Sequence, residues 1–215
     1  MTMINDLLKA TLETLYMVSV SLILAYLVGL PLGVVLVGSK KNGLFPHRVL
    51  HAVLGWIVDM TRSVPFIILM ILIIPLTRLL AGTAIGTTAA IVPLSLCAIP
   101  FVIRMVEQSL LEVDQGKIEA AEAMGAKHWQ IIFYVYLGEA VPSLVRGVAI
   151  TTINIIGYSA MAGALGGGGL GNFAITHGFY RFDTITIVYT VVIIILLVIT
   201  IQTLFNFASK KIDHR

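Results

Sequence analysis

The chain has 215 residues, of which 58% are hydrophobic and 12% are charged, and its formal net charge is +3. The charged fraction is about half that of an ordinary soluble domain, which excludes a water-soluble fold because so much apolar surface would have no interior to occupy. The basic residues do not form a run with interleaved aromatic residues, so nucleic-acid binding is not predicted.

Five apolar stretches are long enough to cross a bilayer, since about 20 consecutive helical residues match its hydrocarbon thickness. We expect these spans at residues 17–37, 64–80, 85–105, 144–165 and 184–206. Blocks such as 185–201 do not alternate between apolar and polar residues as the strands of a membrane barrel do. The predicted fold is an all-α polytopic membrane protein whose five transmembrane helices are embedded in the lipid bilayer.

Basic residues fall mainly on one side of this predicted membrane. Eight are placed on that side and three on the other: Lys40, Lys41, Arg48, Lys117, Lys127, Lys210, Lys211 and Arg215 against Lys9, Arg78 and Arg181. The positive-inside rule then puts the N-terminus outside and the C-terminus in the cytoplasm. The first residues, 1–9, lack the pattern of a cleaved signal peptide, so we expect the first span to be retained.

Residues 47–61 are less apolar than their neighbours and have apolar side chains at helical spacing. We expect an amphipathic helix along the membrane surface before the second span. His47 and His51 are four residues apart, but no cysteine or carboxylate cluster accompanies them, and no metal site is predicted. Gly29 and Gly33 form a GxxxG pair that would let another helix approach closely. Arg104 and Glu107 are expected to pair near the end of the third span.

The connection between the third and fourth spans, residues 114–138, has the pattern helix, break, helix. Asp114 is a good N-cap, the residues from Glu119 to Met124 are mostly strong helix formers, and Gly125 can adopt the left-handed conformation that ends a helix. We therefore expect a short helix that projects into the cytoplasm. Its alanines at positions 120, 121 and 123 would present a slim face to another protein.

Glu119-Ala120-Ala121, followed by Gly125, resembles the EAA motif in the membrane subunits of bacterial ATP-binding-cassette (ABC) importers. The resemblance implies that this helix couples the permease to a cytoplasmic ATPase, and that the ATPase-docking residues are Glu119, Ala120, Ala121, Glu122, Ala123, Met124 and Gly125. In the family a Leu-Pro pair follows the break, whereas Gly138 follows Leu137 here. This difference from the family pattern affects the backbone geometry after the break and not the docking role of the helix.

Three further segments resemble the methionine-uptake permeases of bacteria, and the similarity covers nearly the whole chain. They are Arg62-Ser63-Val64-Pro65-Phe66-Ile67-Ile68, Ala90-Ile91-Val92-Pro93-Leu94, and Gly157-Tyr158-Ser159-Ala160-Met161 through Gly168-Gly169-Leu170-Gly171. This resemblance implies a type I ABC importer transmembrane domain in the bacterial cytoplasmic membrane, whose cargo is L- or D-methionine and some derivatives. It implies a second copy of the chain, two ABC ATPase subunits and an extracytoplasmic methionine-binding protein, often a lipoprotein.

The chain has no GxxxxGK[ST] phosphate-binding loop, so ATP hydrolysis is expected on a partner chain and the subunit itself is not an enzyme and needs no cofactor. Gly166, Gly168 and Gly171 match the dinucleotide pattern GxGxxG, but they follow a membrane helix and not a strand. We expect a tight external connection there. Gly157-Tyr158-Ser159-Ala160 also approaches the GxSG sequence of intramembrane serine proteases, with His177 further on, and this distant alternative predicts Ser159 as nucleophile.

Polar residues inside the fourth span should face the bundle or a cavity because lipid offers them no partner. Candidates for lining the translocation pathway are Asn154, Tyr158, Ser159 and Met161. Met161 could offer a soft surface to a thioether, although packing is the commoner role of a buried methionine.

The predicted organisation is one transmembrane domain at residues 11–208, which contains the cytoplasmic coupling loop 114–138, and a cytoplasmic tail at 209–215. Five spans without inverted internal symmetry predict a homodimer with the pathway on its axis and transport by alternating access. The alternatives are an ABC importer permease for another amino acid or small solute, a secondary transporter that needs no ATPase, and the protease.

Overall fold

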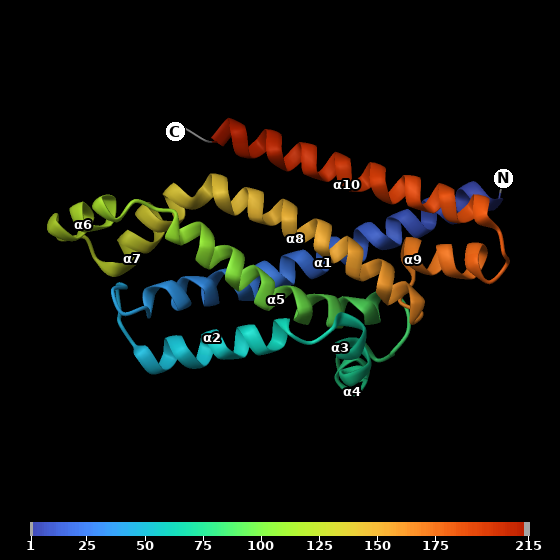
Figure 1. The fold of residues 1–215 in the computed structure, drawn as a ribbon, viewed down its shortest axis with the longest axis horizontal. Helices are drawn as coiled ribbons and strands as arrows, with labels where there is room; N and C mark the ends of the chain where they lie inside the picture. Colours follow the sequence, from blue (N-terminus) through green and yellow to red (C-terminus); the bar gives the residue numbers. More distant parts are fainter. Residues whose placement is uncertain (1, 213–215) are drawn as a thin grey trace.

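The protein was analysed as a computed structural model, which describes residues 2–212. Within this range the chain forms helices and no strands. The long helices lie lengthwise beside one another, with α6 (Gln115–Ala123) and α7 (His128–Gln130) at one end of the bundle and α9 (Gly169–Phe173) at the other (Figure 1). These two ends are called the α6 end and the α9 end below. The predicted all-α architecture is confirmed.

The remaining elements follow the chain from one end of the bundle to the other. They are α1 (Thr2–Gly38), α2 (Arg48–Arg62), α3 (Phe66–Leu72), α4 (Ile74–Ala81), α5 (Thr87–Leu111), the π-helix η1 (Ile131–Leu137), α8 (Gly138–Ala164), the π-helix η2 (Ala174–Phe179) and α10 (Thr184–Ile212). Four helical stretches of the described chain are long and apolar enough to cross a membrane, or five if the bent pair of α2 and α3 is one span.

The second predicted span, residues 64–80, is wrong as a continuous helix. The chain bends by 100° between α2 and α3, and α4 begins separately after Ile73. Pro65 accounts for the first break because it lacks an N–H and disfavours helical geometry at Val64. Pro75 lies in the first turn of α4, where its missing donor costs nothing.

The predicted surface helix at residues 47–61 is also wrong in its placement. α2 does form there, but it packs lengthwise against α1 and α5 (Figure 1), where Val58 is buried with Leu36 and Ile103. His47 accepts a hydrogen bond from the Leu50 N–H at 3.1 Å, and His51 lies 2.9 Å from the Leu36 carbonyl oxygen. Both imidazoles therefore have structural roles at the start of this helix.

The contact between α1 and α5 is the most extensive in the bundle. A Cβ on Gly29 would lie 2.6 Å from Cγ1 of Val102, and one on Gly33 would lie 2.6 Å from Cγ1 of Val106. The predicted GxxxG contact is thus confirmed, and its partner is a pair of valines one turn apart on α5. The absence of two side chains lets the backbones approach closely, which strengthens van der Waals packing where lipid supplies no hydrophobic force between helices.

The glycine-rich connection from α8 to α9 turns sharply, with positive φ at Gly166, Gly168 and Gly169. It is held by α1: the carboxylate of Glu13 accepts the Gly169 N–H at 2.9 Å, and the Thr14 hydroxyl accepts the Leu170 N–H at 2.9 Å. The expected tight connection is confirmed, and it joins the α9 end to the first helix.

The outer surface of α10 is apolar and packs against no other element of residues 2–212. Its exposed large side chains include Ile185, Val188, Tyr189, Val192, Ile195, Leu196 and Ile199. α10 continues to Ile212, so residues 209–212 of the predicted tail are helical, while residues 213–215, including Arg215, lie outside the described part.

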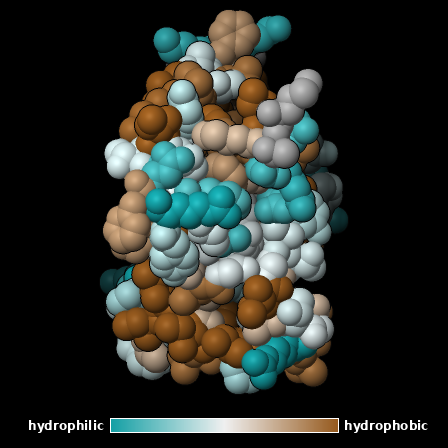
Figure 2. All heavy atoms as spheres, turned by 90° about the vertical axis from the view of Figure 1, so that its right-hand side faces the viewer, coloured by the Kyte–Doolittle hydropathy of each residue, from teal (hydrophilic) through white to brown (hydrophobic). Residues whose placement is uncertain are grey.

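Seen from the α9 end, hydrophilic residues gather across the middle, with hydrophobic residues above and below (Figure 2). A polar cavity of about 220 Å³ opens at this end between the start of α1 and the η2 region, and its charged and polar lining comprises Asp6, Lys9, Glu13, Asn172, Thr176 and His177.

We predict that Gly33→Val destabilises the fold by about 1–3 kcal/mol, because the new side chain must displace α5 backbone and Val106. The measurement is the thermal midpoint of the detergent-solubilised protein. Gly55→Ala is the matched control, since a Cβ at this helical glycine meets only Arg104 Nη2, at 3.7 Å. An unchanged midpoint in Gly33→Val would contradict the close contact.

Candidate functional site

The segment between α5 and α8 begins and ends its short helix as predicted. The Asp114 carboxylate accepts the Gly116 N–H at 2.7 Å and caps α6. At the other end Gly125 has φ +78°, and the Ala126 N–H donates to the Ala121 carbonyl at 3.0 Å. The left-handed glycine reverses the chain and sends it back toward the bundle through α7 and η1.

α6 has one buried face and one exposed face. Ile118 and Ala121 are buried against Ile131 and Tyr136 of η1. The exposed set comprises Glu119, Ala120, Glu122, Ala123, Met124 and Gly125, with Met124 exposed by 81%. Ala121 is therefore misplaced in the predicted slim outer face, because it anchors the helix to the protein. Ala120 and Ala123 alone supply small side chains on the outside.

Two hollows flank this exposed face. One of about 460 Å³ lies on the Gly125 side and is lined by Ala121, Met124, Gly125, Ala126, Gln130, Ile131, Tyr134 and Val135. The other, of about 580 Å³, separates α6 from the connection after α1 and contains Lys40 and Lys41 on one wall and Glu119 and Glu122 on the other. A protruding helix with a groove on each side offers a partner protein a surface on which to dock.

The π-helix η1 joins this segment to α8 and was not predicted. Seven residues, Ile131–Leu137, adopt i to i+5 hydrogen bonding, which is uncommon and found mostly at functional sites. Gly138 follows with φ −59°, a value that proline would impose. Gly138 thus has a φ that the family's proline could also adopt.

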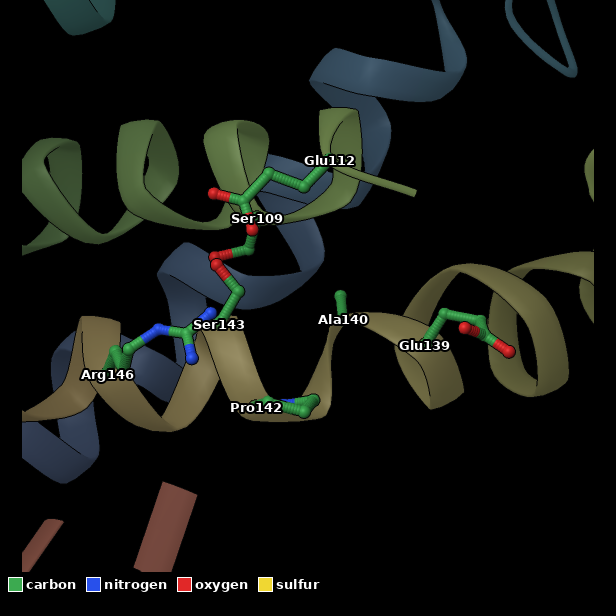
Figure 3. A pocket seen from close by; sticks show the side chains of 7 residues that line it. All are labelled: Ser109, Glu112, Glu139, Ala140, Pro142, Ser143 and Arg146. Carbon is green, nitrogen blue, oxygen red and sulfur yellow. The ribbon is translucent and has the colours of Figure 1, made fainter. Parts of the chain in front are cut away.

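A salt bridge of 2.6 Å between Lys117 Nζ and Glu139 Oε2 ties α6 to the first turn of α8. On the opposite side of that turn, Ser109, Ser143 and Arg146 converge in a small pocket between α5 and α8, with Glu139 directed away from them (Figure 3). Ser209 of α10 donates to the Pro142 carbonyl at 3.0 Å and accepts from Arg146 at 3.4 Å. The α6 ends of α8 and α10 are thereby linked.

The structure separates the four pathway candidates on α8. Ser159 is buried, and its hydroxyl donates to the Ile156 carbonyl at 2.8 Å, so it faces the interior. Tyr158 stacks on Phe66 of α3 with ring centroids 5.0 Å apart. Met161 is 46% exposed, and Asn154 is partly buried. Tyr158 and Met161 reach the surface, whereas Ser159 does not.

The protease arrangement is not formed. His177 lies on η2, where Thr176 Oγ1 is 2.9 Å from its Nδ1 and Phe173 stacks on its ring at 4.5 Å. No hydrogen bond joins it to Ser159 in residues 2–212, and the serine hydroxyl is already engaged within its own helix.

Charged side chains meet between α2 and α5 in a cluster that the sequence revealed only in part. Arg104 forms the expected pair with Glu107 at 2.6 Å, and it also binds both oxygens of Asp59, at 3.1 and 2.7 Å. Asp59 is far away in the chain, and its part in the cluster carries no local sequence signal.

Comparison with known proteins gives consistent matches. The family described as binding-protein-dependent transport system inner membrane component matches residues 29–215. A probable D-methionine transport system permease protein of Vibrio cholerae is 50% identical over 97% of this chain and 93% of the relative. The methionine import system permease protein of Bacillus subtilis is 40% identical over 99% of this chain and 96% of the relative.

Solved structures match the fold over nearly the whole chain. A chain of the MetNI methionine ABC transporter in an inward-facing conformation is 40% identical, superposes with a TM-score of 0.97 and covers 99% of both chains. A chain from an amino acid ABC transporter crystallised with histidines has 19% identity and a TM-score of 0.77, which shows a shared fold.

We predict that Arg104→Met destabilises the protein by about 2–3 kcal/mol, because Asp59 and Glu107 would be left as carboxylates without a counter-charge. The thermal midpoint in detergent is the measurement. Adding Glu107→Gln to Arg104→Met should recover part of the loss, whereas Glu107→Gln combined with native Arg104 should not stabilise. If the double variant were less stable than Arg104→Met, the pairing would not be the cause.

Proposed function

This chain belongs to the family of binding-protein-dependent transport system inner membrane components, and we propose that it is the subunit through which an ABC importer carries methionine across the cytoplasmic membrane. As a permease subunit it is not an enzyme, and the ATPase is a separate chain. The observation that carries the proposal is the projecting α6 with its exposed face from Glu119 to Gly125. The relatives that this chain matches along nearly their whole length are named as methionine permeases.

The contacts around α6 explain how a partner's movement would reach the membrane. The buried face of α6 is packed on η1, and the Lys117–Glu139 salt bridge ties it to α8. A push on α6 therefore moves the first turn of α8, and with it α10 through Ser209. In our proposal, ATP binding closes two ATPase subunits, each displaces one α6, and α8 tilts between inward and outward access.

A second copy of this chain completes the pathway. α8 packs against α1, α3, α5, α9 and α10, yet one of its faces has no partner among residues 2–212. Ile150, Gly157 and Met161 lie along that face and are exposed. Their spacing of seven and four residues places them on one side of a helix, so a second subunit can face them across the transport axis.

The orientation and the delivery of cargo are part of the proposal. The α6 end carries Lys40, Lys41, Lys117, Lys127, Lys210 and Lys211, which supports a cytoplasmic location for this end under the positive-inside rule. The α9 end and the N-terminus then face outward. The polar surface of this end, with its cavity beside Glu13 and His177, suits an extracytoplasmic methionine-binding protein. ATP stays on the ATPase, and the permease holds no cofactor of its own.

The central test is reconstitution. The chain should co-purify with an ABC ATPase encoded in the same cells, and proteoliposomes containing both should accumulate labelled methionine only when ATP and a methionine-binding protein are supplied. Uptake of another amino acid in preference to methionine would favour the related alternative, and uptake without ATPase would favour a secondary transporter.

We predict that Gly125→Val lowers ATP-dependent uptake about tenfold while the complex still assembles. The space around Gly125 is open, so the effect comes from its φ of +78°, which costs a β-branched residue about 1–2 kcal/mol. Uptake and ATPase activity are measured in the same proteoliposomes. Gly125→Asn is the matched control, because asparagine tolerates this conformation, and its uptake should stay close to that of the native chain. Equal uptake by the valine variant would contradict a role for the α6 geometry.

A further inference from the structure

Arg62 ends α2 immediately before the 100° break. It lies 14 residues along a helix that begins at the α6 end, or about 21 Å at 1.5 Å per residue. In the proposed orientation this depth falls within the roughly 30 Å hydrocarbon layer, where a charged side chain is costly unless it faces water or a partner. A broken helix with a charge at the break is a common way to build a binding site at this depth.

The neighbouring charges on α2 and α5 form a cluster of their own. Arg104 is engaged by Asp59 and Glu107, and its Nη2 also donates to the Gly55 carbonyl at 3.3 Å. Arg62 forms no salt bridge in residues 2–212, where the three pairs are those of Arg104 and the Lys117–Glu139 pair. Its guanidinium is exposed and keeps its donors available for an anion.

The surroundings of Arg62 are aromatic and adjoin the pathway face of α8. Its Cζ lies 5.8 Å from the ring centre of Phe101. Phe66, four residues after Arg62, stacks on Tyr158 of α8. The Phe101 ring holds the guanidinium in place by cation–π attraction without consuming its hydrogen-bond donors.

Beside Tyr158, α8 exposes Gly157 and Met161, and no atom lies within 4 Å of a Cβ built on Gly157. The helix face is therefore open at Gly157, next to the polarizable thioether of Met161. This open face and the guanidinium offer two kinds of contact, one for a flexible apolar group and one for an anion.

We propose that Arg62 binds the α-carboxylate of the amino acid cargo during its passage, while the cargo's side chain lies against Gly157 and Met161. A guanidinium matches a carboxylate with two parallel hydrogen bonds, which a lysine cannot reproduce. This assignment rests on the proposed transport function. It makes Arg62 a residue that selects zwitterionic amino acids over cargo without a carboxylate.

The experiment uses the assembled permease and ATPase in proteoliposomes with the methionine-binding protein. The probe is photo-methionine, a diazirine analogue that retains the carboxylate, and labelled permease peptides are mapped by mass spectrometry. The native chain should be labelled around residues 157–161. In Arg62→Met, which keeps the unbranched stem, labelling and methionine uptake should each fall at least about tenfold, since a charged hydrogen-bonded pair is lost. ATPase activity and assembly should remain.

Arg62→Lys keeps the charge but cannot form two parallel hydrogen bonds with a carboxylate, so the labelling of this variant should fall at least about threefold. It also decides the matter if Arg62→Met does not assemble. Arg78→Met is the matched control, because Arg78 lies on α4 beside a largely apolar cavity and should leave uptake within about twofold of native. Unchanged labelling and uptake in either Arg62 variant would overturn the assignment. Absence of ATP-dependent methionine uptake in the native complex would instead refute the proposed function.

Discussion

The close contact between α1 and α5 supports everything else in this fold. Lipid tails are as apolar as the helices, so helices in a membrane associate by packing and hydrogen bonding and not by the hydrophobic effect. Gly29 and Gly33 remove the side chains that would keep α5 away, and Val102 and Val106 fill the space. α5 in turn carries Arg104 and Phe101 toward α2 and leads directly into the Asp114 cap of α6. The positions of α6 and of the charge cluster between α2 and α5 therefore depend on this interface.

The functional surfaces lie where helices are interrupted. Pro65 breaks the second span beside Arg62, Gly125 ends α6, and a run of glycines separates α8 from α9. Each interruption frees backbone groups that must find other partners in a membrane. At the α9 end Glu13 and Thr14 supply them. At the α6 end, the π-helix η1 packs against the buried face of α6 and leads directly into α8.

Local patterns predicted the parts that depend on neighbours in the chain. Asp114 caps α6 because its side chain needs only the next turn, and Gly125 adopts a conformation that its own lack of a Cβ permits. The GxxxG pair likewise predicted a close contact with another helix. The prediction of a slim alanine face was correct for Ala120 and Ala123 but wrong for Ala121, because which side of a short helix is buried depends on what lies beneath it.

The amino-acid sequence by itself determined that the chain crosses a membrane, that its spans are helical and that it has no phosphate loop, since these follow from apolar length and residue type. Only the tertiary structure decided that α2 runs along α1 and α5, that the second span is bent, and that Asp59 binds Arg104 from 45 residues away. An amphipathic helix has the same local pattern whether it lies on a bilayer or against other helices. Its partners come from distant parts of the chain, and packing alone selects among them.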